Sequence, residues 1–173
     1  MLRKFEFRAG PPPEPRVDPV HTDILERVRV FLAQRDVRGA VEHLNLHSSF
    51  RFTTLSRFDP PLLRGVYLYD KLHRGTVEPV TQGADDSYAF IIRNERRPFW
   101  TEDSMMDTRL LEHPARVQVR SYVGAPIKVP GAIWGVLAHF DKRPRKVPEG
   151  EGELLLQAAD MIARELYSNR PAA

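Results

Sequence analysis

Residues 120–141 have the sequence RSYVGAPIKVPGAIWGVLAHFD, and this stretch carries the strongest structural signal in the chain. Within residues 121–129 apolar side chains alternate with other residues, as expected for a strand with one buried face. Pro130 and Gly131 then supply the two central residues of a type II turn. Residues 133–141 follow as the partner strand. We therefore predict a β-hairpin here.

A long helix is predicted directly after this hairpin. The basic loop of residues 142–146 leads into residues 149–168, where acidic residues occupy the start, the end that the helix dipole favours for negative charge. Pro171 is expected to end the helix. One apolar stripe follows helical spacing, formed by Leu155, Ala158 or Ala159, Ile162 and Leu166.

The segment before the hairpin predicts a helix and two more strands. Thr22 or Asp23 can cap a helix that extends to about Leu46, with an interruption at Gly39. Aromatic and β-branched residues predict strands over 50–58 and 62–71, separated by a turn at residues 59–61. Further along, the sequence predicts a loop over residues 73–86 and a short helix over 87–93. A short strand over 98–101 and an irregular lid over 108–118 are expected to follow.

Length and composition indicate one domain with an N-terminal extension. The chain has 173 residues, a net charge of +3 and no cysteine. Five of the 15 prolines lie in residues 9–20, so residues 1–20 are expected to form a flexible strap and residues 21–173 a single domain. No apolar run reaches the roughly 20 residues of a membrane span, and no apolar region follows the basic N-terminus. We expect a cytoplasmic protein.

The order and spacing of these segments resemble the GAF domain family. The resemblance is carried by Ser-Tyr-x-Gly-x-Pro at 121–126, Gly-x-Leu-x-x-Phe-Asp at 135–141, the long helix that follows, and the strands at 50–59 and 63–70. It extends over about residues 22–168. It implies an α+β fold (α/β in the broad sense) with a central antiparallel sheet. The N- and C-terminal helices would pack on one face, and loops and short helices on the other would enclose a small ligand.

Candidate ligand-binding residues lie on the segments that should surround this pocket. An apolar cavity with a few aimed polar groups is the usual small-molecule site. Arg120 could pair with a carboxylate or phosphate. His139 could ligate a heme iron or could be a hydrogen-bonded structural histidine, and the structural role is favoured. The candidates are Tyr88, Phe90, Trp100, Asp103, Arg120, Tyr122 and His139.

The sequence also restricts which activities of the family are open to this chain. Free methionine sulfoxide reductases use cysteines, and phytochrome-type domains attach a bilin through cysteine, so neither chemistry is expected here, although non-covalent bilin binding stays open. Of the cyclic-nucleotide motif, Asn94, Phe99 and Asp103 match, but Glu95 and Ser104 depart from it. Asp103 is better explained as the cap of a helix near residue 105.

Other polar clusters give weak signals. His43 and His47 have a spacing that suits a metal, but no third ligand is evident. The acidic pairs at 85–86 and 102–103 lack a nucleophile and a base, so we predict no enzyme. The basic loop at 142–146 could contact phosphate or an acidic partner, yet a solvated loop is favoured and nucleic acid is not expected as a partner.

The sequence therefore predicts a non-catalytic sensory or regulatory module that binds a small molecule and signals through helix-mediated association. Its cofactor is unknown, the membrane is not a partner, and a homodimer through the terminal helices is expected. The alternative is a dimerisation or interaction module whose pocket is filled by its own side chains. That alternative predicts an apolar interface made by Ile24, Phe31, Leu155 and Ile162.

Overall fold

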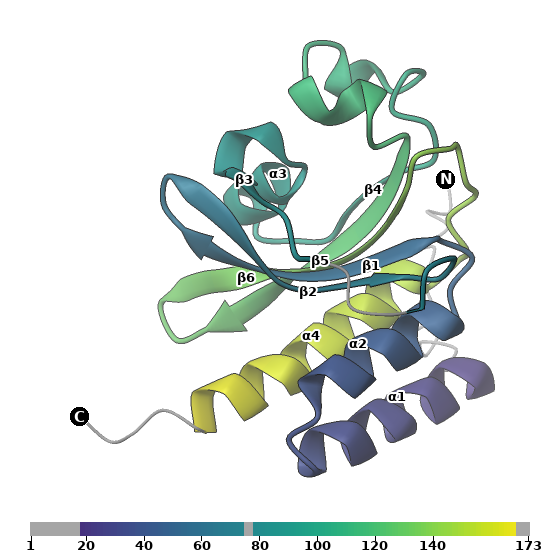
Figure 1. The fold of residues 1–173 in the computed structure, drawn as a ribbon, viewed down its shortest axis with the longest axis vertical. Coiled ribbons are helices and arrows are strands. Elements are labelled where there is room, and N and C mark those ends of the chain that lie inside the picture. The colour runs from purple at the N-terminus through teal and green to yellow at the C-terminus, as the bar shows by residue number, and fades with distance from the viewer. Residues whose placement is uncertain (1–17, 75–77, 169–173) are drawn as a thin grey trace, which may run out of the picture.

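The computed structural model describes residues 18–74 and 78–168. One six-stranded antiparallel sheet forms its centre (Figure 1). The predicted hairpin is confirmed, with Gly131 at a φ of 78° in its turn. In spatial order the strands are β3 (Thr81–Gly83), β2 (Leu62–Asp70), β1 (Phe52–Asp59), β6 (Ala132–Asp141), β5 (Ser121–Val129) and β4 (Phe99–Thr101).

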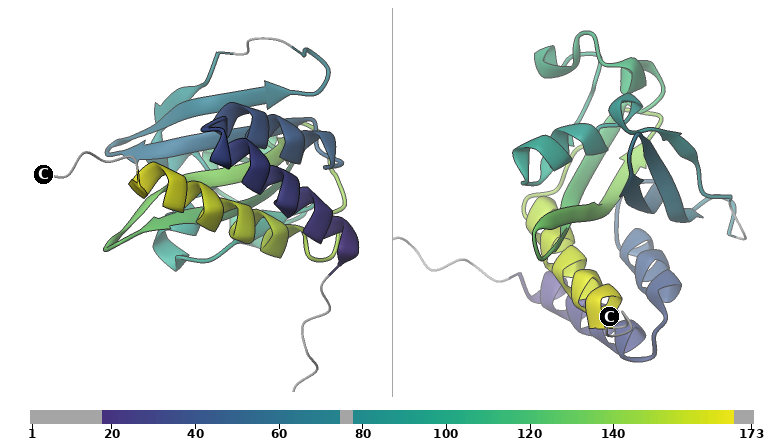
Figure 2. Two further views of the ribbon diagram at one scale, coloured as in Figure 1. Left: turned by 90° about the horizontal axis from the view of Figure 1, so that it is seen from below. Right: turned by 90° about the vertical axis from the view of Figure 1, so that its left-hand side faces the viewer.

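Three helices cover one face of the sheet: α1 (Pro19–Ala33), α2 (Val37–Leu46) and α4 (Glu151–Ser168). Figure 2 shows them side by side beneath the strands, with the first and last helices on the same side. This arrangement confirms the predicted placement of the terminal helices. In the described parts of the chain, no helix is both long and apolar enough to cross a membrane.

The N-terminal helical region ends at Leu46 as predicted, but it differs from the prediction at its start and in its middle. Helix α1 begins at Pro19, inside the predicted strap, because the Asp18 carboxylate accepts a hydrogen bond from the Val20 amide at 2.9 Å. The single predicted helix is two, because Asp36 caps α2 by accepting from the Gly39 amide at 2.7 Å. A Cβ on residue 39 would clash with that carboxylate and with the Phe31 ring, so glycine leaves room for this cap. The rest of the strap and Pro171 lie outside the described residues.

Short helices and loops cover the other face. They are the 3₁₀ helix η1 (Ala84–Asp86), helix α3 (Ala89–Glu95), and the 3₁₀ helices η2 (Thr108–Leu110) and η3 (Pro114–Val117). We call residues 84–95 and 104–119 together the lid. The predicted short helix and short strand are confirmed as α3 and β4. The segment predicted as a loop contains β3, which pairs with β2 through only three residues.

Two hydrophobic cores lie on opposite sides of the sheet. The helix-side core contains Leu55, Val123, Ala125, Ile127 and Leu137 from the strands. The lid-side core contains Tyr122, Val136 and Ala138 from the strands, packed against Tyr88, Ile92 and Phe99 among others. Val136, Leu137 and Ala138 are consecutive on β6 and belong in turn to the lid-side, the helix-side and the lid-side core. This alternation is the two-residue period of a strand.

The helix-side core also accounts for the residues that the alternative hypothesis assigns to an intermolecular interface. Ile24, Leu155 and Ile162 are at most 5% exposed, and Phe31 packs against the same core. This part of the alternative is wrong, because the apolar stripes of α1 and α4 face the sheet and each other within one chain. A dimer through these helices would have to use their outer surfaces.

Candidate functional site

A cavity of about 290 Å³ lies between the sheet and the lid. Strand residues form its floor, and residues of the lid and of the segment before it form its walls. The floor contributes Thr54, Ser56, Leu63, Leu68, Tyr122, Val136 and Phe140. The walls contribute Val80, Gln82, Asp86, Ser87, Tyr88, Ala89, Pro114, Ala115, Gln118 and Val119.

Two tyrosines are among the residues that line this cavity. The rings of Tyr88 and Tyr122 meet edge to face with centroids 5.4 Å apart. The Tyr88 hydroxyl donates to the Val119 carbonyl oxygen at 3.0 Å, which ties α3 to the far part of the lid. In the described parts of the chain, the Tyr122 hydroxyl has no hydrogen-bond partner. Burial raises the pKa of the Tyr122 phenol, so it is a neutral group that can donate or accept a hydrogen bond.

The other polar groups of the lining are hydroxyls and amides. Thr54 donates its hydroxyl to the Tyr67 carbonyl oxygen at 3.2 Å and lies 3.2 Å from the Ser56 hydroxyl oxygen. Gln82 and Gln118 contribute side-chain amides, and Asp86 is the one carboxylate in the lining. No lysine, arginine or histidine is among the lining residues. The cavity therefore offers hydrogen bonds and one negative charge, and no cation for an anionic ligand.

Of the seven candidate residues, the structure brings Tyr88 and Tyr122 into the cavity lining. Phe90 is half-buried on α3, and its ring is 5.5 Å from the guanidinium carbon of Arg93. Trp100 is 51% exposed on β4, whose outward-facing position it occupies. Both residues lie on the expected segments, but on faces that do not line the cavity.

Asp103 and Arg120 pair with each other instead of facing the cavity. The Arg120 Nη2 atom lies 2.8 Å from the Asp103 Oδ1 atom, and that oxygen also accepts from the Met105 amide at 3.1 Å. The guanidinium of Arg120 holds the pKa of Asp103 below its usual range. Asp103 thus organises a turn over residues 104–106, where the sequence predicted a helix cap. Its predicted contact with a ligand finds no geometric support.

His139 lies on the helix side of the sheet, because its neighbour Phe140 takes the cavity side. It is fully buried, with Nδ1 2.6 Å from the Thr53 hydroxyl oxygen and Nε2 3.3 Å from a Glu151 carboxylate oxygen at the start of α4. Its ring stacks on Phe50. This placement fits the structural role that was favoured for the histidine. It also removes His139 as an axial ligand for a heme in the cavity.

Sequence reasoning did not single out most of the polar lining. Thr54 and Ser56 have the parity on β1 that faces the lid, and the β-bulge opposite them adds its extra residue, Val66, to β2. Gln118 and Ser87 lie in irregular segments that have no period from which a direction could be deduced. In the sequence, the signal for the direction of cavity side chains was limited to the alternation in residues 121–129.

The two clustered histidines do not complete a metal site. The rings of His43 and His47 are 4.4 Å apart, and His47 Nδ1 lies 3.0 Å from the His43 carbonyl oxygen. Burial, together with the charge of His47, lowers the pKa of His43. Across residues 18–74 and 78–168, no group of three or more potential ligands is placed to hold a metal ion.

The fold and the cavity together define a class of protein: a three-layer α+β domain whose single sheet separates a helical layer from a lid over a small-molecule-sized chamber. The family model for the GAF domain matches residues 25–166. The chain belongs to the GAF domain family. Members of this family include sensory and regulatory domains, and several bind small molecules.

Solved structures share the fold at low sequence identity. The GAF domain of an Acinetobacter phosphoenolpyruvate-protein phosphotransferase is 12% identical with a TM-score of 0.71, covering 91% of this chain and 100% of its own. A phycocyanobilin-bound GAF domain of a cyanobacterial phytochrome is 17% identical with a TM-score of 0.68. The match covers 90% of this chain and 100% of that domain.

The free methionine-R-sulfoxide reductase of Neisseria meningitidis, in complex with its substrate, is also similar. It is 13% identical with a TM-score of 0.71, over 87% of this chain and 90% of its own. A search of curated proteins gives no significant match. At these identities the similarity establishes the fold alone.

Proposed function

We propose that this chain is a non-catalytic sensory or regulatory GAF domain that binds a small molecule between the sheet and the lid. The observation that carries the proposal is the cavity of about 290 Å³ lined by Tyr122, whose hydroxyl has no hydrogen-bond partner among the described residues. A hydroxyl that the protein leaves unpaired in a cavity lining can donate a hydrogen bond to a ligand atom or accept one from it.

The lining supports a neutral or amine-bearing ligand. Apolar walls favour a compact apolar body, and the hydroxyl and amide groups favour one or two hydrogen bonds. Asp86 favours a positive charge near the lid, whereas an anion would meet no cation in the lining. The lining lacks the paired nucleophile and base that catalysis would need, which supports a binding role over an enzymatic one.

Signalling would follow from the way in which the lid is held. The hydrogen bond from Tyr88 to Val119 joins two parts of the lid, and Tyr88 itself lines the cavity. A ligand that prefers one lid position shifts the population toward it. The outer surfaces of α1 and α4 expose Val30 and Tyr167, and we propose that a homodimer forms there. We also propose that the protein acts in the cytoplasm.

The alternative module, with a self-filled pocket, receives less support. It requires that the protein's own side chains occupy the space between sheet and lid, where the structure has a cavity. Association without a ligand stays open as a role for the helical layer. Light scattering of the purified protein, at concentrations spanning the micromolar range, measures the oligomeric state directly.

The binding proposal can be tested by native mass spectrometry and thermal-shift screening with neutral and amine-bearing metabolites. We expect a compound that co-purifies or raises the melting temperature of the wild type. Ala115→Phe should abolish this effect because Ala115 lines the cavity, whereas Val117→Phe should not, since Val117 is exposed on the same short helix η3. Tyr122→Phe should weaken binding by about tenfold.

Two results would contradict the proposal. One is that no compound co-purifies with the wild type or stabilises it. The other is that Ala115→Phe and Val117→Phe bind the same compound equally well, because the ligand would then lie outside the cavity.

A further inference from the structure

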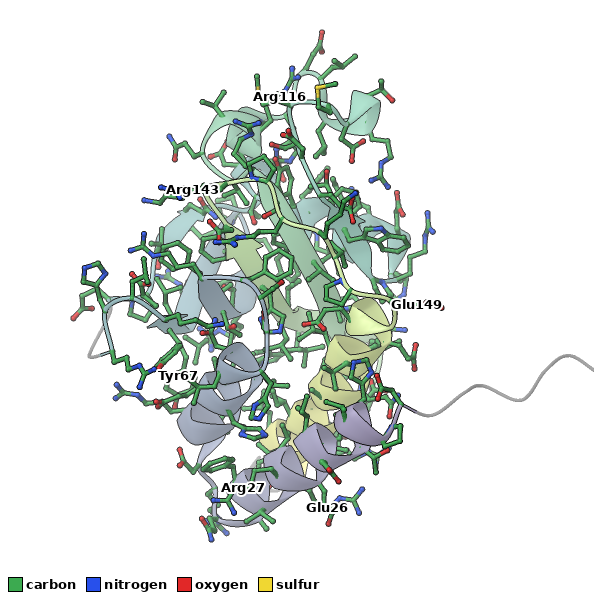
Figure 3. The ribbon with its side chains drawn as sticks, turned by 90° about the vertical axis from the view of Figure 1, so that its right-hand side faces the viewer. Glu26, Arg27, Tyr67, Arg116, Arg143 and Glu149 are labelled. Carbon is green, nitrogen blue, oxygen red and sulfur yellow. The ribbon has the colours of Figure 1, made fainter. Side chains whose placement is uncertain are left out.

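A buried row of four polar side chains crosses the helix side of the sheet. Its members come from α2, β1, β6 and α4: Asn45, Thr53, His139 and Glu151. We call these four residues the polar row. Each is at most 5% exposed, and the His139 ring stacks on Phe50 with centroids 6.0 Å apart. Figure 3 labels Glu149, where the loop after β6 enters α4, so the polar row ends at the start of that helix.

The hydrogen bonds of the polar row run in one direction. The Asn45 amide nitrogen donates to the Arg51 carbonyl oxygen at 3.2 Å and to the Thr53 hydroxyl oxygen at 2.8 Å. The Thr53 oxygen also lies 2.6 Å from His139 Nδ1, and among the described residues the Thr53 hydroxyl has no other acceptor. Thr53 therefore donates to Nδ1, which leaves the ring proton of a neutral His139 on Nε2. Nε2 is the ring atom that faces Glu151.

The last contact of the polar row is close but incomplete. His139 Nε2 lies 3.3 Å from Glu151 Oε1, yet neither atom takes part in a hydrogen bond within residues 18–74 and 78–168. Both atoms are shielded from solvent, and a buried donor beside an unpaired acceptor is unfavourable. A small movement of β6 or α4 that aligns the two groups would remove this cost. The contact therefore has two arrangements of different energy, as a conformational switch requires.

The cavity reaches this contact through the pairing of β1 with β6. Phe52 lies opposite Phe140, and the next pair along the two strands is Thr53 opposite His139. The Phe52 and Phe140 rings stack with centroids 4.8 Å apart, and Phe140 lines the cavity. Successive strand residues point to opposite faces, so His139 points to the helices. A ligand that presses on Phe140 from the lid side therefore pushes β6 in the direction of Glu151.

We propose that occupancy of the cavity closes the His139–Glu151 contact and thereby fixes the first turn of α4 against the sheet. This regulation rests on the proposed function, because it takes cavity occupancy as its input. Glu151 is the first residue of α4, a helix of 18 residues, so a hydrogen bond there restrains the tilt of the whole helix. The outer surface of α4 belongs to the proposed homodimer interface, and the tilt of the helix determines how that surface is presented.

The test uses a side chain as the occupant, so it does not require a known ligand. Ala115→Phe adds a ring to the cavity wall, and Val117→Phe adds the same ring to an exposed position of η3. In the ¹⁵N-labelled full chain, we expect Ala115→Phe to slow hydrogen exchange of the Leu154 and Leu155 amides by about fivefold. Val117→Phe should leave both rates unchanged.

A second pair of variants tests whether Glu151 carries the effect. Glu151→Met keeps the length of the side chain and removes the acceptor, so the response of the α4 amides to Ala115→Phe should be lost. Glu153→Met is the matched control, because Glu153 is exposed in the same turn of α4, and it should keep the full response. If Ala115→Phe does not fold, the smaller Ala115→Leu serves as the occupant, and the same directions are expected.

The His139 ring supplies a spectroscopic readout that a purely structural role would not move. Long-range ¹H–¹⁵N spectra should place the proton on Nε2 in the wild type. Ala115→Phe should move that proton signal downfield as the hydrogen bond to Glu151 forms.

Four outcomes would overturn the proposal. A proton on Nδ1 would reverse the direction of the polar row, and equal responses in Glu151→Met and Glu153→Met would exclude Glu151 as the receiving group. A folded Ala115→Phe with unchanged α4 amides and an unchanged Nε2 signal would exclude the coupling, as would an equal response to Val117→Phe. A screen that finds no ligand bears on the binding proposal alone, so the two failures are distinguishable.

Discussion

The two faces of the sheet use the same strands in opposite ways. On the helix side, alternate strand residues pack against α2 and α4, with α1 behind these two helices, and have essentially no exposed surface. On the lid side, the intervening residues face short helices and leave a cavity of about 290 Å³. Long amphipathic helices present continuous stripes that fill space, whereas short irregular segments do not. The difference indicates that the helix side supplies stability and the lid side supplies a place to bind.

The largest expected effect comes from adjacent residues on β6. Leu137 is fully buried against the helices, so Leu137→Ala should lower the free energy of unfolding by about 2–5 kcal/mol. Val136 borders an existing cavity, so Val136→Ala should cost only about 1–2 kcal/mol, mainly from lost apolar burial. Urea unfolding of the two variants measures the difference. Equal costs would mean that the lid side is as tightly packed as the helix side.

The elements of this fold were predictable where their side chains repeat. The hairpin and α4 follow from periods of two and 3.6 residues, whereas the placement of the terminal helices was implied by the resemblance to the GAF family. The start of α1 was missed because Asp18 lies next to a proline-rich stretch, and proline at the first helical position resembles loop sequence. The break before α2 depends on one aspartate that caps and one glycine that makes room for it.

The candidate site was less predictable, because it depends on the face to which each side chain points and not only on the segment that carries it. Tyr88 and Tyr122 were found, since both are large aromatic residues on segments that border the lid. His139 was placed in the pocket region although β6 turns it to the helices. A change of one residue in strand parity reverses the face, and the extra residues of the two bulges, Val66 on β2 and Trp134 on β6, make the parity of those strands ambiguous in the sequence.

A smaller effect distinguishes two adjacent threonines of β1. The Thr53 hydroxyl accepts from Asn45 Nδ2 at 2.8 Å and contacts His139, all of them buried on the helix side. Thr53→Val should cost about 1–3 kcal/mol, because it leaves buried polar groups without a partner. Thr54 lines the cavity, where water can replace its hydroxyl, so Thr54→Val should cost less than about 1 kcal/mol.

Thermal and urea unfolding of both threonine variants test this difference. The side chains have the same volume in each substitution, so packing changes are matched. A cost for Thr54→Val as large as that for Thr53→Val would show that the lid side contains an equally constrained polar network. It would also weaken the argument that cavity hydroxyls are free to bind a ligand.

The smallest expected effect is a pH dependence of the lid. Burial lowers the pKa of His113, opposed in part by the Ser87 carbonyl and by Asp86. As the pH falls below about 6.5, the unfolded or opened lid binds a proton that the closed lid resists. Stability contributed by neutral His113 is therefore present at pH 7 and is lost as the pH falls toward the lowered pKa. The loss should be under about 1 kcal/mol, because His113 is only partly buried.

Hydrogen exchange at pH 7 and pH 5, corrected for the intrinsic rate, measures this effect locally. Acid should reduce the protection of lid amides such as that of Val119, while amides of β6 keep theirs. His113→Gln should remove most of the pH dependence in the lid. His43, whose pKa is also lowered by burial, lies on α2 beneath the sheet, so His43→Gln should leave the lid response intact. If His43→Gln abolished the response and His113→Gln did not, the pH-sensitive layer would be the helical one, and the lid would be the more rigid face.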